Sequence, residues 1–146
     1  HNIWYNFTYT YDVSALTGRI YVDGTQAGIR TSMTSPGDFT TAHDILIGNG
    51  PSSNDNALIK VCEIGYWKGV CLSASQVTSI YNNGRPRNLL GVEREYLKGY
   101  WRLNSKDATG SNNVIDYSGA GHHGTTATSG TNDLADSDFD ITDVPT

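Results

Sequence analysis

The sequence predicts an all-β fold, a jelly-roll sandwich of antiparallel strands with one short helix. Segments that alternate apolar and polar residues recur at intervals of roughly 8 to 15 residues, with turn signals between them. The 146 residues include 16 glycines and nine tyrosines, which is typical of turn-rich and aromatic-rich sheets. A single segment has the full set of signals that start and stop a helix.

The N-terminal third predicts three strands. Apolar residues alternate with mostly polar ones through residues 3–11, which indicates a strand with one strongly apolar face. Residues 12–18 predict a turn, and residues 19–22 predict a second strand. Asp23-Gly24 then supplies the positive φ angles of a two-residue hairpin turn, so we expect the chain to return through residues 26–30.

Further strands are expected along the rest of the chain. Ile45-Leu46-Ile47 predicts a short buried strand, and residues 57–67 form the longest strand candidate. Gly65 within that candidate indicates a bulge or a close backbone approach. Two more strands are expected over residues 96–103 and 114–117.

The helix is expected over about residues 73–83. Ser73 is the predicted N-cap, and Gln76 three residues later completes a capping box. Gly84 can adopt the left-handed conformation that closes a helix, and Pro86 prevents its continuation. This helix is a marker of the fold and indicates no chemistry by itself.

Charge and hydropathy exclude two classes of partner. The net charge of −5 argues against nucleic acid, whose phosphates require a basic surface. No apolar run approaches the roughly 20 residues that span a bilayer, so no membrane insertion is expected. We divide the chain into a domain over residues 1–127 and an acidic C-terminal tail over residues 128–146. Cys62 and Cys71 are expected as two half-buried thiols, with a disulfide as the alternative if Lys68-Gly69 reverses the chain.

Four segments, taken in order, resemble elements of one known family. WYNFTYTYD and GRIYVDGTQ resemble two paired strands that lead into a hairpin, and ILIGNG resembles the strand that follows. EIGYW with LSASQVTSIYNNGRP resembles the closing strand and helix, and LKGYWRLNSKDATGSNNVIDYSGAGHHGT resembles an element that often comes next. The family is the laminin-G-like group of the concanavalin A-like lectin/glucanase superfamily.

The resemblance implies a jelly-roll module. Similar domains occur in structural proteins of phages and other viruses, and the final Asp143-Val144-Pro145 is similar to their tails. The resemblance therefore implies a structural or adhesion role in a virus or phage particle, at the virion surface or outside the cell. Its partners would be other copies or other structural proteins of the assembly, and host-surface glycans. The alternative is a carbohydrate-binding domain of a secreted multidomain protein or of a glycoside hydrolase.

The sequence departs from the family pattern in two ways. An acidic pair is usual where this chain has Cys62-Glu63, and one residue is inserted near Lys68-Gly69. The first half of the family's domain has no counterpart here, so we expect a processed product or a piece of a longer protein. In such a piece, strand edges and an apolar sheet face would be left open.

No catalytic residues are expected. Glycoside hydrolysis needs two carboxyl groups that flank the scissile bond. The glucanase members of the fold place them in an E-x-D-x-x-E strand, and none of the three glutamates, Glu63, Glu93 and Glu95, lies in that pattern.

Two kinds of binding site are candidates. Calcium takes loop carboxylate and carbonyl oxygens, and Asp55, Asn56, Asp107 and Asp116 are the candidate ligands. The same residues also suit turn capping, and Asp116 in particular is expected to anchor a turn. Sugar binding needs an aromatic platform beside polar groups. Tyr66, Tyr100 and Tyr117 are the candidates, because strand parity predicts that they face outward. Packing within the sheets is the alternative for each of them.

Overall fold

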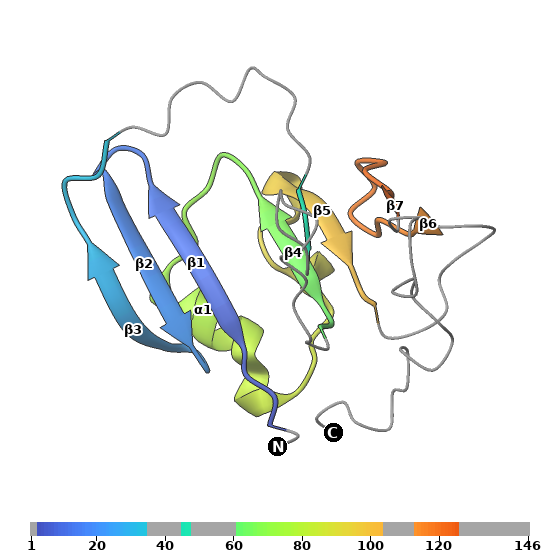
Figure 1. The fold of residues 1–146 in the computed structure, drawn as a ribbon, viewed down its shortest axis with the longest axis horizontal. Helices are drawn as coiled ribbons and strands as arrows, with labels where there is room; N and C mark the ends of the chain where they lie inside the picture. The colour runs from blue at the N-terminus through green and yellow to red at the C-terminus, as the bar shows by residue number, and fades with distance from the viewer. Residues whose placement is uncertain (1–2, 35–44, 48–60, 104–112, 126–146) are drawn as a thin grey trace, which may run out of the picture.

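The computed structural model describes residues 3–34, 45–47, 61–103 and 113–125, and these confirm the all-β class with one short helix. Figure 1 shows a three-stranded antiparallel sheet in the order β1-β2-β3, the pair β4-β5 and the pair β6-β7. The strands are β1 (Phe7–Asp12), β2 (Thr17–Val22), β3 (Thr25–Arg30), β4 (Ile64–Trp67), β5 (Leu97–Trp101), β6 (Asn113–Val114) and β7 (Gly124–Thr125). The helix is α1 (Ala74–Tyr81), and short 3-10 turns span Asn82–Gly84, Leu89–Gly91 and Arg94–Tyr96. The predicted tail over residues 128–146 lies outside the described residues.

Local turn chemistry builds the first sheet. Asp23 and Gly24 have φ angles of 51° and 73°, which confirms the predicted two-residue hairpin between β2 and β3. At the other end of β2, the Asp12 carboxylate accepts hydrogen bonds from the backbone N–H groups of Ser14 and Ala15 at 2.9 and 3.0 Å. These bonds fix the turn between β1 and β2 and therefore the register of the sheet.

Helix α1 forms as its sequence predicts but ends slightly earlier. Ser73 caps it, with the Gln76 N–H donating to the Ser73 hydroxyl and the Ser73 N–H donating to the Gln76 side chain at 2.8 Å. The expected end near residue 83 moves forward because Asn82 already adopts the left-handed conformation, with φ 50°. Gly84 also has positive φ, as expected.

The core lies between α1, the inner face of β2 and the β4-β5 pair. Val77 and Ile80 of α1 are buried there, as is Tyr21 of β2. The remaining buried members of this cluster are Leu72, Leu89, Val92, Leu97 and Tyr100.

The expected strands after β3 are shorter than predicted or are absent. Residues 45–47 form no strand, and Ile45 is 56% exposed, so the expectation of a short buried strand is wrong. Of the strand expected over 57–67, residues 57–60 lie outside the described residues. Residues 61–63 form no strand, and β4 begins at Ile64, because Glu63 has φ 53°, outside the extended region. β5 ends at Trp101, and Leu103 has φ 53°. The expected strand over 114–117 stops at Val114, because Asp116 organises a turn instead.

Strands β4 and β5 share the tripeptide Gly-Tyr-Trp, at residues 65–67 and 99–101. In each strand the tryptophan ring lies over the glycine two residues before it, and a Cβ on either glycine would overlap that ring. This is the close approach that the sequence predicts for Gly65, and a register shift follows between Tyr66 and Trp67. The Trp67 indole donates to the Val92 carbonyl at 2.8 Å, and the Trp101 indole donates to the His122 carbonyl at 2.9 Å. Each tryptophan ring therefore packs on its own strand, and its indole N–H bonds a carbonyl of a neighbouring loop.

Candidate functional site

An open cleft of about 1690 Å³ separates β1 from β4. In Figure 1 these two strands face each other across the molecule. Residues 3–14 form one wall, and residues 61–72 form the other. Ile80 and Tyr81 of α1 also line the cleft, together with the segment that follows the helix. The cleft is thus formed by the first sheet, the second sheet and the helix.

One side of the β1 wall is a row of exposed apolar side chains. Ile3, Tyr5, Phe7 and Tyr9 are 66%, 64%, 67% and 53% exposed. Phe7 and Tyr9 share a face of β1, because side chains two residues apart in a strand point the same way, and Ile3 and Tyr5 lie in the segment directly before β1. Tyr66 of the opposite wall is 40% exposed and also lines the cleft. We call Tyr5, Phe7, Tyr9 and Tyr66 the aromatic row.

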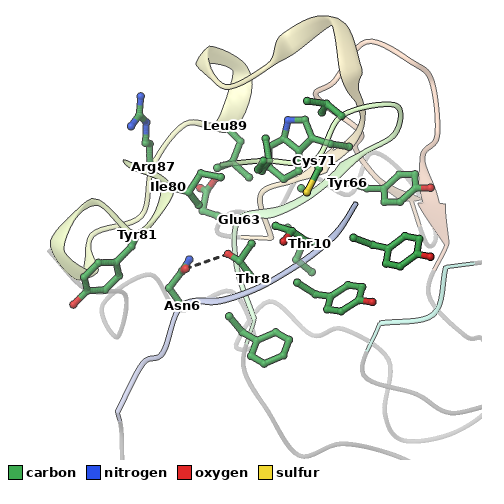
Figure 2. A pocket seen from close by; sticks show the side chains of 18 of the residues that line it. Asn6, Thr8, Thr10, Glu63, Tyr66, Cys71, Ile80, Tyr81, Arg87 and Leu89 are labelled. Atoms are coloured by element: carbon green, nitrogen blue, oxygen red, sulfur yellow. Dashed lines mark hydrogen bonds between the residues drawn. The ribbon is translucent and has the colours of Figure 1, made fainter. Parts of the chain in front are cut away.

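The other side of the β1 wall is polar. Figure 2 shows Asn6, Thr8 and Thr10 projecting from β1 toward Glu63, and the Thr8 hydroxyl donates to the Asn6 side-chain oxygen at 3.4 Å. Thr10 is 6% exposed, and its hydroxyl has no hydrogen-bond partner within the described residues. The β1 wall of the cleft therefore has aromatic rings on one side and small polar groups on the other.

The Glu63 carboxylate at the cleft contacts Tyr100 of β5 and Arg102, which directly follows β5. It accepts a hydrogen bond from the Tyr100 hydroxyl, and its other oxygen lies 3.6 Å from Nε of Arg102. Burial, together with the hydrogen bond to Glu63, raises the pKa of Tyr100 well above its ordinary value. Tyr100 therefore stays protonated and acts as a donor that orients the carboxylate.

The two other carboxylates that line the described part of the cleft also serve the backbone. Asp12 caps the turn after β1, and hydrogen bonds from Ser14 and Ala15 lower its pKa. The Asp23 carboxylate accepts the Asn6 N–H at 2.8 Å, and the Asn6 carbonyl accepts the Asp23 N–H at 2.9 Å. Each of these acids has a structural partner.

The three tyrosines predicted for sugar binding lie in different environments. Tyr66 is exposed at the cleft, as strand parity predicts. Tyr100 is 1% exposed, so the expectation that it faces outward is wrong. Tyr117 is half-buried, with its ring centroid 6.2 Å from that of Tyr100 and 5.7 Å from the Arg102 guanidinium carbon. The structure does not bring the three together as one surface.

The register of β4 and β5 explains the difference between Tyr66 and Tyr100. Tyr66 lies opposite Gly99, and Tyr100 lies opposite Gly65, so the two tyrosines are on opposite faces of the pair. The face of Tyr100 packs on the core, whereas the face of Tyr66 opens on the cleft. Two identical tripeptides in antiparallel strands therefore give one buried and one exposed tyrosine.

Of the four calcium candidates, Asp116 alone lies in the described residues, and it anchors a turn. One carboxylate oxygen accepts the Tyr100 and Ser118 N–H groups at 2.9 and 2.8 Å, and the other accepts the His122 N–H and the Ser118 hydroxyl, both at 2.9 Å. Asp55, Asn56 and Asp107 lie outside the described residues. In the part of the chain that the structure describes, no group of three acidic, cysteine or histidine residues could hold a metal ion.

Cys62 and Cys71 are free, half-buried thiols that line the cleft, as the sequence analysis expected. Burial, with the charge of Glu63, raises the pKa of Cys62 and keeps its thiol protonated.

No helix in the described residues is long and apolar enough to cross a membrane.

The apolar face of residues 3–11 is evident in the sequence, but the sequence does not predict that it is a binding surface. The signal that could have found it is the pairing of rings at residues 5, 7 and 9 with polar residues at 6, 8 and 10.

Comparison with known proteins gives a single family. A laminin-G-type family model, described as the concanavalin A-like lectin/glucanases superfamily, matches residues 1–78. That range is more than half of the chain and contains the first sheet, β4 and the first five residues of α1. No curated protein matches the chain, and no solved structure matches it either.

Proposed function

Because the chain belongs to the concanavalin A-like lectin/glucanases superfamily, we propose that it is a non-catalytic binding module whose ligands are glycans. The observation that carries this proposal is the aromatic row beside the cleft. Along β1 its rings repeat about every 6.8 Å, which is twice the rise per residue of an antiparallel strand. The apolar faces of successive sugar rings stack on such a surface.

The roles of the cleft carboxylates support a non-catalytic module. A glycosidase needs one carboxyl group that can give up a proton and a second that acts as nucleophile or base. Glu63 is held by Tyr100 and Arg102, while Asp12 and Asp23 fix turns. The carboxyl groups that line the described part of the cleft are therefore engaged in structural hydrogen bonds or in an ion pair.

We place the module in a structural or adhesion protein of a virus or phage particle, outside the cell or at the virion surface. This setting rests on the similarity of the Trp101 segment and of the last three residues to such proteins. Its partners there are other copies or other structural proteins of the assembly. The second candidate is a carbohydrate-binding domain of a secreted multidomain protein or glycoside hydrolase, which the same aromatic row supports. An enzyme domain in the same full-length protein would favour this second candidate.

Calorimetric titration with an oligosaccharide selected on a glycan array tests the aromatic row. We expect Tyr5→Leu and Tyr66→Leu each to weaken binding about three- to tenfold, because stacking on a ring contributes about 0.5–1.5 kcal/mol. Ile29→Ala is the matched control, since Ile29 is 56% exposed on β3 and does not line the cleft. Equal affinities for wild type and both tyrosine variants would refute the site. Repeating the titration with a calcium chelator tests the predicted calcium at Asp55, Asn56 and Asp107.

A further inference from the structure

The C-terminal end of α1 is a left-handed turn that exposes an asparagine directly before a glycine. Asn82, Asn83 and Gly84 have φ angles of 50°, 57° and 82°, and none of the three is buried. Asn83 is exposed, and its side chain makes no hydrogen bond within the described residues. The Asn82 side chain, in contrast, donates to the Arg85 carbonyl at 3.4 Å. The side chain of Asn83 can therefore turn toward the main chain that follows it.

The Asn83-Gly84 pair has the chemistry of a self-modification site. The main-chain nitrogen of a glycine reaches the preceding side chain easily, because glycine has no Cβ and moves freely in φ and ψ. When the Gly84 nitrogen attacks Cγ of Asn83, an N–Cγ bond forms and the bond from Cγ to the amide nitrogen breaks. The Gly84 proton leaves with the amide group as ammonia, and a five-membered succinimide remains. Water then opens this ring at one of its two carbonyl carbons.

The two ways of opening the ring give two products. Opening at Cγ gives an aspartate with the normal main chain. Opening at the main-chain carbonyl carbon of Asn83 gives an isoaspartate, in which the main chain runs through the former side chain and is one carbon atom longer. Both products carry a negative charge that the asparagine lacks.

The turn can reach the geometry of this attack without disturbing the core. Asn83 has ψ 37°, so ψ must rotate before the Gly84 nitrogen meets Cγ. Because the three residues of the turn bury nothing, this rotation removes no packing. Water, which opens the ring, reaches Asn83 because that residue is exposed.

The main chain is anchored on both sides of the turn. Before it, the Asn82 N–H donates to the Thr78 carbonyl of α1. After it, Nη1 of Arg87 donates to the Ser79 carbonyl at 2.7 Å, and Leu89 is buried in the core. One extra main-chain carbon between these anchors must displace one of them. A negative charge at the C-terminal end of a helix is also unfavourable.

We propose that Asn83 deamidates spontaneously and that its isoaspartyl product loosens the end of α1. The segment that would shift includes Gly84, Arg85 and Arg87, which line the cleft. Deamidation thus changes the chain next to the cleft with age, without an enzyme and with water as the co-reactant. The proposal concerns a modification of the chain and does not depend on glycan binding.

Incubation of residues 1–146 at mildly alkaline pH, followed by peptide mapping with mass spectrometry, tests the modification. We expect Asn83 to lose ammonia at least about tenfold faster than Asn82, because the residue after Asn82 has a Cβ and the residue after Asn83 does not. Asn83→Gln should stay unmodified at this position, since its longer side chain closes a ring less readily. Asn82→Gln is the matched control and should leave the rate at Asn83 unchanged. An Asn83 that stays intact, or that reacts no faster than Asn82, would overturn the proposal.

Urea denaturation of the separated products tests the structural consequence. Asn83→Asp adds the charge without the extra main-chain carbon, so it isolates the effect of charge. We expect the isoaspartyl form, purified by chromatography, to unfold at a lower urea concentration than Asn83→Asp. Amide hydrogen exchange at Asn82 should also be faster in the isoaspartyl form. Equal unfolding midpoints for the two proteins would overturn the claim that the added carbon loosens α1.

Discussion

The carboxylate of Asp116 joins β5 to the turn formed by residues 117–122. It accepts one hydrogen bond from the Tyr100 N–H and three from Ser118 and His122. Burial by itself would raise its pKa, but the hydrogen bonds from Ser118, Tyr100 and His122 outweigh burial and hold the pKa below its ordinary value. The sequence predicted this role from the Asp-Tyr-Ser-Gly turn, although it did not predict the bond to Tyr100.

Asp116→Asn tests the anchor. The side chain keeps its shape, but its NH₂ group replaces an oxygen that accepts two hydrogen bonds, so donors face each other. We expect the free energy of unfolding at pH 7 to fall by about 1–3 kcal/mol, measured by urea denaturation. Ser118→Ala, which removes only the hydroxyl donor to the same oxygen, should cost less.

The lowered pKa also gives this prediction a pH dependence. The folded pKa of Asp116 lies below the unfolded value of about 3.9. Its stabilising contribution is therefore complete above that value and is lost as the pH falls through the folded pKa. The stability difference between wild type and Asp116→Asn should be constant from pH 7 to pH 5 and should shrink toward pH 2. A difference that stays unchanged at pH 2 would contradict the assignment.

At the scale of elements, β4 and β5 each depend on a tryptophan that covers a glycine of its own strand. Their indole N–H groups donate hydrogen bonds to the loop carbonyls of Val92 and His122. The glycines are needed because of this close approach, since neither Gly65 nor Gly99 has positive φ. The loops on both sides of the β4-β5 pair are thus positioned by the same device.

Gly99→Ala tests that device. The added methyl group would overlap the Trp101 ring and force it to move, which weakens the bond from its indole to the His122 carbonyl. We expect a loss of about 1–3 kcal/mol in the free energy of unfolding, with a shift in tryptophan fluorescence. Gly91→Ala is the control, because a Cβ there meets no atom within 4 Å. Equal stabilities for the two variants would show that Trp101 does not need the glycine.

The elements that the sequence predicted best are those whose signals are local. The Asp23-Gly24 hairpin and the Ser73 cap depend on a few adjacent residues, and both form as predicted. The strand at 45–47 and the orientation of Tyr100 depend on what packs against each face, which alternation along one strand does not specify. The same limit applies to the site, because strand parity predicts the outward position of Tyr66 but does not predict the aromatic row on β1.

At the scale of the whole molecule, the first sheet has one packed face and one open face. The packed face includes Tyr21 and meets α1, whereas the open face exposes the apolar side chains of β1 and Ile20. Contiguous apolar surface of this kind marks an interaction site in a folded protein. We therefore assign binding to the exposed face of β1.

Glycan-array binding by residues 1–146, followed by mass spectrometry of the eluted glycans, tests the central claim most directly. The account predicts retention of a defined set of glycans and their recovery at full length. Glycans that are shortened after contact with the protein would contradict the non-catalytic assignment. The absence of binding to any glycan, with and without calcium, would contradict the assignment of the aromatic row as a sugar platform.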